Sequence, residues 1–199
     1  MFLNKIGIKI TSNKPKKLSK LNDSRRYCNY IGEARDNRAF YIQNENISCP
    51  LARYNLGLEE FIQKDIKNLA KTLVNWNDAE TEEKALNYLK NTATLDYSNK
   101  YISIYPLNKN YKEPDLVILI GTPDTFMPLI REICKEKGEW GQYFMSGVGG
   151  MCAETTAIPL STGKSNVSLG CGGSRPHARL KEGELLIGMP YALYKKVSG

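Results

Sequence analysis

The segment that most limits the fold is residues 115–121, which read DLVILIG and are apolar without a break from Leu116 to Ile120. A short, continuous apolar run is typical of a β-strand that is buried on both faces. Such a strand needs a layer of structure on each side of its sheet. Because 199 residues are enough for one well-packed core, we expect a single domain over residues 1–199.

Strand and helix patterns follow one another along the rest of the chain. Alternating or β-branched apolar residues predict further strands at 2–11, 39–43, 100–106, 142–146, 166–170 and 185–190. Helical spacing of apolar residues predicts helices at 58–76, 78–90, 124–137 and 191–197, with Gly138 ending the third of these. The first two carry no recognisable chemistry, and we expect them to cover the sheet. These elements predict an α/β or α+β domain, with a mixed sheet flanked by helices.

Charge and hydropathy argue against several classes of protein. The chain is 41% hydrophobic, as ordinary globular proteins are, and its formal net charge is +7. The densest basic cluster, at 14–26, lacks interleaved aromatic residues, so we expect a solvated surface or a site for an anionic small ligand rather than a nucleic-acid interface. Residues 1–17 include Lys5 and Lys9 and match neither a signal peptide nor a membrane span. We expect a cytoplasmic protein without membrane binding, and the sequence leaves its oligomeric state open.

The chain contains five cysteines, Cys28, Cys49, Cys134, Cys152 and Cys171. A reducing cytosol keeps thiols free, so metal binding, catalysis or burial is expected in place of disulfides. Cys134 falls one residue beyond the apolar stripe of a predicted helix and has charged neighbours. We interpret it as a packing residue and exclude it from the candidate site.

Cys49 and Cys152 are each expected at the start of a helix. Pro50 is a residue type favoured at the first helical position, and Ser48 is expected to cap that helix, so Cys49 falls at its N-terminus. A short helical turn over 153–157 predicts a similar position for Cys152. Free backbone N–H groups at such a position favour a thiolate.

Two glycine-rich segments, GVGGMC at 147–152 and GCGGSR at 170–175, carry Cys152 and Cys171. Glycine lets backbone N–H groups approach a ligand or cluster closely. The residues expected to contact a cofactor in these segments are Gly149, Gly150, Gly172, Gly173, Ser174 and Arg175. His177 is a further candidate for holding a substrate, and Glu154, Thr155 and Thr156 are candidates for lining the same pocket.

Several motifs occur together in one order: CPLARYNLGL, then GVGGMCAETTAIPL, then LGCGGSR, and finally IGMP. With these motifs, nearly the full length of the chain resembles the uncharacterised family called domain of unknown function 169. The resemblance implies little about activity, because the family name assigns none. The function therefore has to be argued from the residues.

The favoured hypothesis is an iron–sulfur cluster, of the 4Fe–4S type, bound by Cys28, Cys49, Cys152 and Cys171, with a redox or small-molecule-transforming role. The chain lacks a compact C-x₂-C pair, so these ligands have to converge from distant loops. A structural zinc site with the same ligands is the lesser metal alternative. Without metal, the chain is either a thiol enzyme that uses Cys152 or Cys49 with His177 as base, or a module whose GCGGSR loop holds an anionic small ligand. Whether the protein is an enzyme, and which redox or small-molecule partner it has, stay open.

Overall fold

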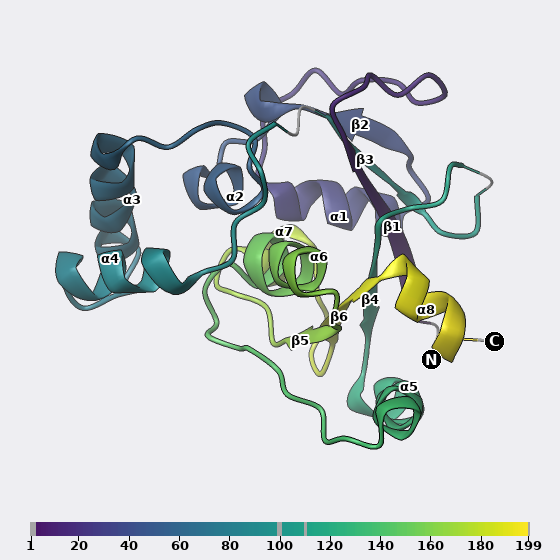
Figure 1. The fold of residues 1–199 in the computed structure, drawn as a ribbon. Coiled ribbons are helices and arrows are strands. Elements are labelled where there is room, and N and C mark those ends of the chain that lie inside the picture. The colour runs from purple at the N-terminus through teal and green to yellow at the C-terminus, as the bar shows by residue number, and fades with distance from the viewer. Residues whose placement is uncertain (1–2, 99–100, 110, 199) are drawn as a thin grey trace.

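The computed structural model describes residues 3–98, 101–109 and 111–198. Within these residues, six strands form one sheet in the order β2-β3-β1-β4-β6-β5 (Figure 1). The strands are β1 (Asn4–Thr11), β2 (Phe40–Ile42), β3 (Tyr101–Pro106), β4 (Leu116–Gly121), β5 (Asn166–Ser168) and β6 (Leu185–Pro190). All ladders between neighbouring strands are antiparallel, so the expected mixed sheet is an antiparallel one and the α+β alternative describes the fold. Antiparallel neighbouring strands need no helical crossover connection between them.

The strand β4 lies inside the sheet, as its apolar sequence predicts. It pairs with β1 on one side and with β6 on the other, and all six of its residues are buried. Ile118 and Ile120 contribute to a large core cluster on one face of the sheet, whereas Val117 and Leu119 contribute to a second cluster on the opposite face. The alternation of side chains along the strand therefore fills two cores with one apolar run.

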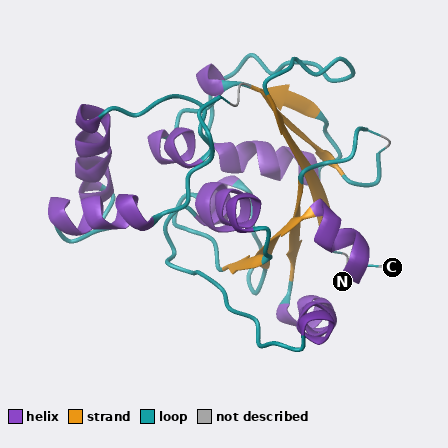
Figure 2. Cartoon of the chain, in the orientation of Figure 1, coloured by secondary structure: helices purple, strands orange, loops and turns teal. Residues whose placement is uncertain are grey.

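Helices of different length surround the sheet (Figure 2). They are α1 (Tyr27–Arg35), α2 (Pro50–Asn55), α3 (Gln63–Asn75), α4 (Glu82–Asn91), α5 (Pro123–Lys137), α6 (Ile158–Thr162), α7 (Ser174–His177) and α8 (Tyr191–Val197), with a 3₁₀ turn η1 (Asn44–Asn46) and a π-helix η2 (Gly150–Ala157). Side chains of α5 and α8 join the smaller core, and those of α1, α2 and η2 join the larger one. No helix of the described residues is long and apolar enough to cross a membrane.

The hairpin of α3 and α4 occupies a different place from the one expected. It lies beside α2, at the side of the molecule away from the sheet (Figure 1). The Tyr54 hydroxyl of α2 donates to the Leu89 carbonyl of α4 at 3.3 Å, and Leu69 and Leu73 pack into the larger core. The amphipathic pattern thus identified the two helices correctly, but not the surface that they cover.

Residues 142–146 form no strand, contrary to the sequence prediction. Their backbone pairs with a side chain: Phe144 N–H donates to Asn166 Oδ1 at 2.7 Å, and Asn166 Nδ2 donates to the Phe144 carbonyl at 2.8 Å. Phe144 and Met145 are 65% and 50% exposed. The apolar residues Phe144 and Met145 therefore lie on the surface, where the sequence predicted a strand.

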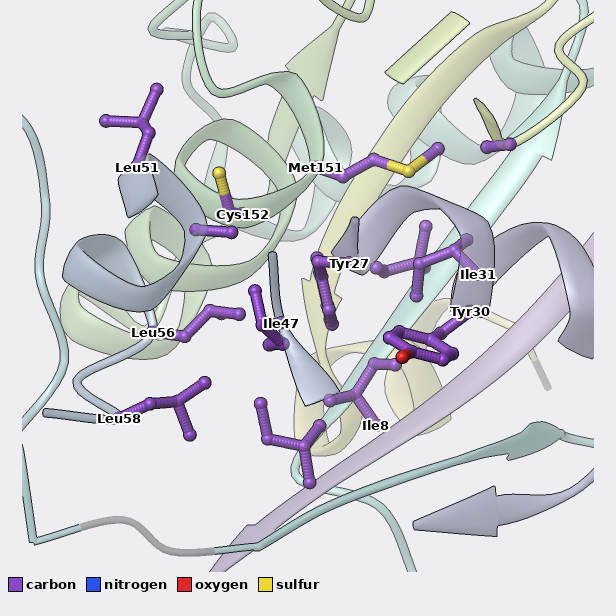
Figure 3. Packing of buried hydrophobic residues seen from close by; sticks show 14 of the residues in the cluster. Ile8, Tyr27, Tyr30, Ile31, Ile47, Leu51, Leu56, Leu58, Met151 and Cys152 are labelled. Carbon is purple, nitrogen blue, oxygen red and sulfur yellow. The ribbon is translucent and has the colours of Figure 1, made fainter. Parts of the chain in front are cut away.

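The helix α1 was not predicted, although its signal is present in the sequence. Tyr27, Tyr30, Ile31 and Ala34 are buried and follow the i, i+3, i+4, i+7 spacing of a helix. Their side chains pack against β1 and against Met151 of η2 in the larger core (Figure 3). This helix carries Cys28, so it positions one of the candidate ligands.

Candidate functional site

Four cysteines that lie far apart in the sequence come together in the fold. Cys28 is the second residue of α1, Cys49 is the N-cap of α2, Cys152 is the third residue of η2, and Cys171 follows β5. Burial raises the pKa of the Cys28, Cys49 and Cys152 thiols, and the charges of the other cysteines raise it further. This influence extends to every pair among the four, which requires all four sulfurs to lie in one neighbourhood.

The cysteines of this site differ in burial, Cys152 being the buried one, and they have backbone N–H groups near them. Cys152 is 6% exposed and packs into the larger core beside Leu51 (Figure 3). Ser174 N–H donates to Cys171 Sγ at 3.2 Å. The N–H groups of Leu51 and Ala52, in the first turn of α2, lower the pKa of Cys49 against the larger effect of burial. Such donors stabilise negative charge on sulfur.

The helix starts differ in detail from those expected. Cys49 itself occupies the cap position of α2 and Pro50 is the first helical residue, so the cap lies one residue later than Ser48. Cys152 lies inside the π-helix η2 instead of before a helical turn. The hydroxyls of Thr155 and Thr156 both donate to the Met151 carbonyl, so these side chains complete the backbone hydrogen bonding of η2.

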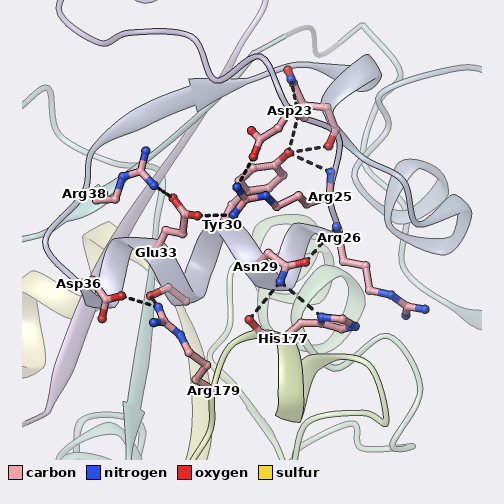
Figure 4. A network of polar contacts seen from close by, with 12 residues as sticks. Asp23, Arg25, Arg26, Asn29, Tyr30, Glu33, Asp36, Arg38, His177 and Arg179 are labelled. Atoms are coloured by element: carbon pink, nitrogen blue, oxygen red, sulfur yellow. Dashed lines mark hydrogen bonds and ion pairs between the residues drawn. The ribbon is translucent and has the colours of Figure 1, made fainter.

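Arg26 is the cationic side chain next to the four cysteines. Its guanidinium lies over the Trp76 ring, 5.4 Å from the centroid, and its charge lowers the pKa of Cys28 and Cys49 against the larger effect of burial. Figure 4 shows neighbouring arginines joined to carboxylates, whereas no ion pair is drawn from the Arg26 guanidinium. Asp78 is close enough for Arg26 to influence its pKa, but no ion pair between them is recorded in the described residues. Within the described residues, the Arg26 guanidinium therefore has an aromatic partner and no ion pair to a carboxylate.

Two of the candidate glycines lie where protein groups approach closely, and for Gly150 the neighbours are backbone atoms, so that position requires glycine. A Cβ on Gly150 would lie 2.7 Å from Cys171 N and from the Gly170 Cα, so the two cysteine-bearing segments pack directly against each other. A Cβ on Gly173 would lie 2.7 Å from Arg26 Nη1 and 4.0 Å from Cys171 Sγ. Gly149 adopts a left-handed conformation with φ of 69°, and Gly172 has open space around it.

Glu154 organises the segments on which Cys152 and Cys171 lie. This carboxylate is 2% exposed and accepts hydrogen bonds from Ser146 N–H and Oγ at 2.7 Å, from Gly147 N–H at 3.1 Å, and from Ser168 Oγ. Ser168 is the last residue of β5, which leads to Cys171. Glu154 thus fixes the glycine-rich loop before η2 relative to the strand that precedes the second cysteine segment.

The polar residues after Cys171 are engaged within the protein. Ser174 is fully buried, and its Oγ accepts the Cys171 N–H at 2.6 Å. The guanidinium of Arg175 donates to three backbone carbonyls, those of Leu169, Lys181 and Glu184. His177 Nδ1 lies 3.4 Å from Asn29 Nδ2 of α1 (Figure 4). Of these three residues, Ser174 has a hydrogen bond to the Cys171 sulfur, and Arg175 N–H donates to the Cys171 carbonyl at 3.1 Å.

Arg26 and Trp76 were not among the residues singled out from the sequence. Arg26 belongs to the basic cluster that we interpreted as solvated, and Trp76 ends a helix to which no chemistry was assigned. A signal was available, because Arg26 directly precedes the Tyr27–Cys28 pair. Cys134, as expected, is separate from the site: it lies on α5 and influences Tyr143 instead.

The spacing of the four thiols bears on what they can hold. Among the described residues, no three His, Cys, Asp or Glu side chains are arranged to hold a single metal ion. Four thiolates on one zinc ion lie about 3.8 Å apart, because each Zn–S bond is about 2.3 Å and the geometry is tetrahedral. A multinuclear cluster holds its cysteine ligands farther apart, since several metal atoms and sulfides lie between them.

Comparisons with known proteins give a family but no activity. The model of the family described as uncharacterised ArCR, domain of unknown function 169, matches residues 4–199. An uncharacterised protein of Methanocaldococcus jannaschii is 26% identical over 198 residues, which cover 96% of this chain and 84% of that protein. No solved structure matches the chain.

Proposed function

We propose that this chain, which belongs to the family described as uncharacterised ArCR, binds an iron–sulfur cluster through Cys28, Cys49, Cys152 and Cys171. The observation that carries this proposal is the convergence of cysteines from four different segments of the chain: the segments of Cys152 and Cys171 pack directly at Gly150, and the other thiols raise the pKa of Cys28, Cys49 and Cys152. Cysteine thiolates are the usual protein ligands of such clusters. We propose the 4Fe–4S type, since one cysteine is available for each of its irons.

The electrostatics of the site favour a positively charged occupant. Burial and mutual repulsion both hold the thiols in their neutral form, so four thiolates cannot form there without compensation. A bound cluster of iron ions supplies that compensation, and metal coordination deprotonates a thiol outright. The N–H groups directed at Cys49 and Cys171 are of the kind that tune cluster potentials.

The same observations weigh against the alternatives. A thiol nucleophile needs a lowered pKa, whereas burial raises the pKa of Cys152 and Cys49. A module that holds an anion through Arg175 would have to break the three hydrogen bonds between this side chain and backbone carbonyls. For a single zinc ion, no three His, Cys, Asp or Glu side chains of the described residues are arranged to hold it.

We assign an electron-transfer or small-molecule redox role to the bound cluster. When bound, it supplies a one-electron carrier next to Arg26, whose positive charge favours the reduced, more negative state. Arg26 is held by Trp76 and lies against Gly173, so its charge stays near the cysteines. Cys171 and Cys49 are only partly buried, which leaves this side of the site within reach of a redox partner.

The test is metal and sulfide analysis of protein prepared anaerobically. We expect brown protein with about four iron and about four acid-labile sulfide per chain, and an electron paramagnetic resonance signal after reduction. Cys171→Ser should lose most of the iron. Cys134→Ala, the matched control on α5, should keep all of it.

Two results would overturn the proposal. One is colourless protein that contains a stoichiometric amount of zinc and neither iron nor sulfide. The other is equal loss of iron from Cys134→Ala and Cys171→Ser, which would show that the ligand set is wrong.

A further inference from the structure

Two consecutive glycines, Gly172 and Gly173, leave a space open beside the Arg26 guanidinium. A Cβ built on Gly173 would lie 2.7 Å from Arg26 Nη1, and the nearest atom of any other described residue, its chain neighbours apart, is Cys171 Sγ at 4.0 Å. A Cβ built on Gly172 would have no such atom within 4 Å. The missing side chains therefore leave room next to both a guanidinium and a sulfur of the cysteine site.

The Arg26 guanidinium is available to a ligand. The neighbouring Arg25 forms ion pairs with Asp23 and Glu33, whereas Figure 4 draws no contact from the Arg26 guanidinium. Arg26 is half-buried and lies over the Trp76 ring, and none of its nitrogens is among the buried, unpaired atoms of the described residues. Solvent therefore reaches a positive charge that the described part of the chain does not pair.

The nearest carboxylate limits the charge that a ligand can carry. The Arg26 charge lowers the pKa of Asp78, against a larger effect of burial, but the described residues contain no ion pair between the two. A ligand with one negative charge would balance Arg26. A second negative charge would be repelled by Asp78 and by the sulfurs of the cysteine site.

The geometry of the guanidinium favours a carboxylate. A guanidinium presents a planar fork of N–H groups, which matches the two oxygens of a carboxylate. The fork of Arg175 is already used, because it donates to the carbonyls of Leu169, Lys181 and Glu184. The Trp76 ring, 38% exposed, offers an apolar surface beside Arg26 for the body of the ligand.

We propose that the space beside Gly173 binds the carboxylate of a small organic monoanion, which accepts two hydrogen bonds from the Arg26 guanidinium. This site goes beyond the proposed cluster, because binding through Arg26 requires no metal. If the cluster is present, the bound carboxylate lies next to it on the side of Cys171.

The test uses three soluble probes with the same aromatic ring: benzoate is a monoanion, benzamide is its neutral counterpart, and phenylphosphonate carries up to two negative charges. Binding to the anaerobically purified protein is measured by saturation-transfer NMR titration at low ionic strength. We expect benzoate to bind at least about tenfold more tightly than benzamide, because charge-assisted hydrogen bonds are made only by the anion. Phenylphosphonate should bind less tightly than benzoate.

Three variants make the result specific. Arg26→Gln should weaken benzoate binding about tenfold. Arg25→Gln, the matched control, changes an arginine that is already paired and should leave the affinity unchanged. Gly173→Ala keeps the Arg26 charge but puts a methyl group into the space, and should also weaken benzoate binding. Its Tm should stay unchanged, since the atom that it meets is the end of a flexible side chain.

The proposal is overturned if benzoate binds no more tightly than benzamide, if Arg26→Gln and Arg25→Gln bind benzoate equally well, or if phenylphosphonate binds as tightly as benzoate. Iron and sulfide are measured on the same samples. Arg26-dependent binding to iron-free protein would contradict the cluster alone, whereas iron-loaded protein without benzoate binding would contradict the carboxylate site alone.

Discussion

Replacing Gly150 by alanine tests whether the two cysteine segments need their observed contact. The added Cβ would lie 2.7 Å from Cys171 N and 2.8 Å from the Gly170 carbonyl carbon, whereas ordinary contact begins at 3.4 Å. Both neighbours are backbone atoms, so the two segments must move apart by several tenths of an ångström. Gly150 does not have a positive φ, and the expected effect is therefore steric alone.

The cost of this overpacking is about 1–3 kcal/mol. For a chain of this size, each 1 kcal/mol lowers Tm by about 2–4 °C, so Gly150→Ala should lower Tm by about 2–12 °C. The iron content should fall as well, because Cys152 and Cys171 lie on the two segments that separate. Calorimetry of the apoprotein gives the first quantity, and iron analysis of the anaerobic protein gives the second.

Gly172→Ala is the matched control for this experiment. It lies beside Cys171, but no atom lies within 4 Å of its added Cβ, and Tm and iron content should stay unchanged. If Gly150→Ala keeps the Tm and iron of the unmodified protein, or if Gly172→Ala loses as much, the two segments do not depend on their close packing.

Three other predictions concern Glu154, Arg26 and Tyr105. Glu154→Gln should lower the free energy of unfolding by about 1–3 kcal/mol in guanidinium titrations, because the charge-assisted hydrogen bonds from Ser146 and Gly147 are weakened. An unchanged unfolding midpoint would show that the Glu154 carboxylate does not stabilise the fold. Arg26→Gln should keep its iron but shift the reduction potential of the bound cluster to a more negative value, because a positive charge that favours the reduced state is lost. Arg131→Gln, at an exposed position of α5, should leave the potential unchanged, and equal potentials in all three proteins would rule out an effect of the Arg26 charge on the cluster. Burial raises the pKa of Tyr105 above its ordinary 10.0, so the neutral phenol stabilises the fold fully below pH 10. Above pH 10 this contribution to the free energy of unfolding is lost by about 1.4 kcal/mol per pH unit. Tyr105→Phe should therefore lose free energy of unfolding less steeply above pH 10, and identical slopes would refute the assignment.

Sequence periodicity predicted those parts of the fold that depend on local burial. The apolar run of β4 and the stripe of α5, which ends at the left-handed Gly138, were both identified correctly. The segment 142–146 was mistaken for a strand because apolar residues alone do not show whether a partner strand exists. Its backbone bonds to the Asn166 side chain instead, which is a contact between distant residues that no local pattern contains.

The candidate site divides in the same way. The cysteines and their glycine neighbours could be singled out as candidates by residue type. Their convergence could not, because it depends on how α1, α2 and η2 pack. Arg26 was missed for a related reason: a basic residue in a basic cluster looks solvated until Trp76 is found against it.

The antiparallel sheet also determines when the cysteine site can form. β4 lies between β1, from the start of the chain, and β6, from near its end, and the cysteine segments come from both halves. The hydroxyls of Tyr27 and Thr156, next to two of these segments, are 3.2 Å apart although the residues are 129 positions apart in the chain. Contacts of such high sequence separation form late and slowly in folding. During synthesis, Cys28 and Cys49 leave the ribosome long before Cys152 and Cys171. Because the site needs all four segments, any metal has to bind after nearly the whole chain has been synthesised and folded.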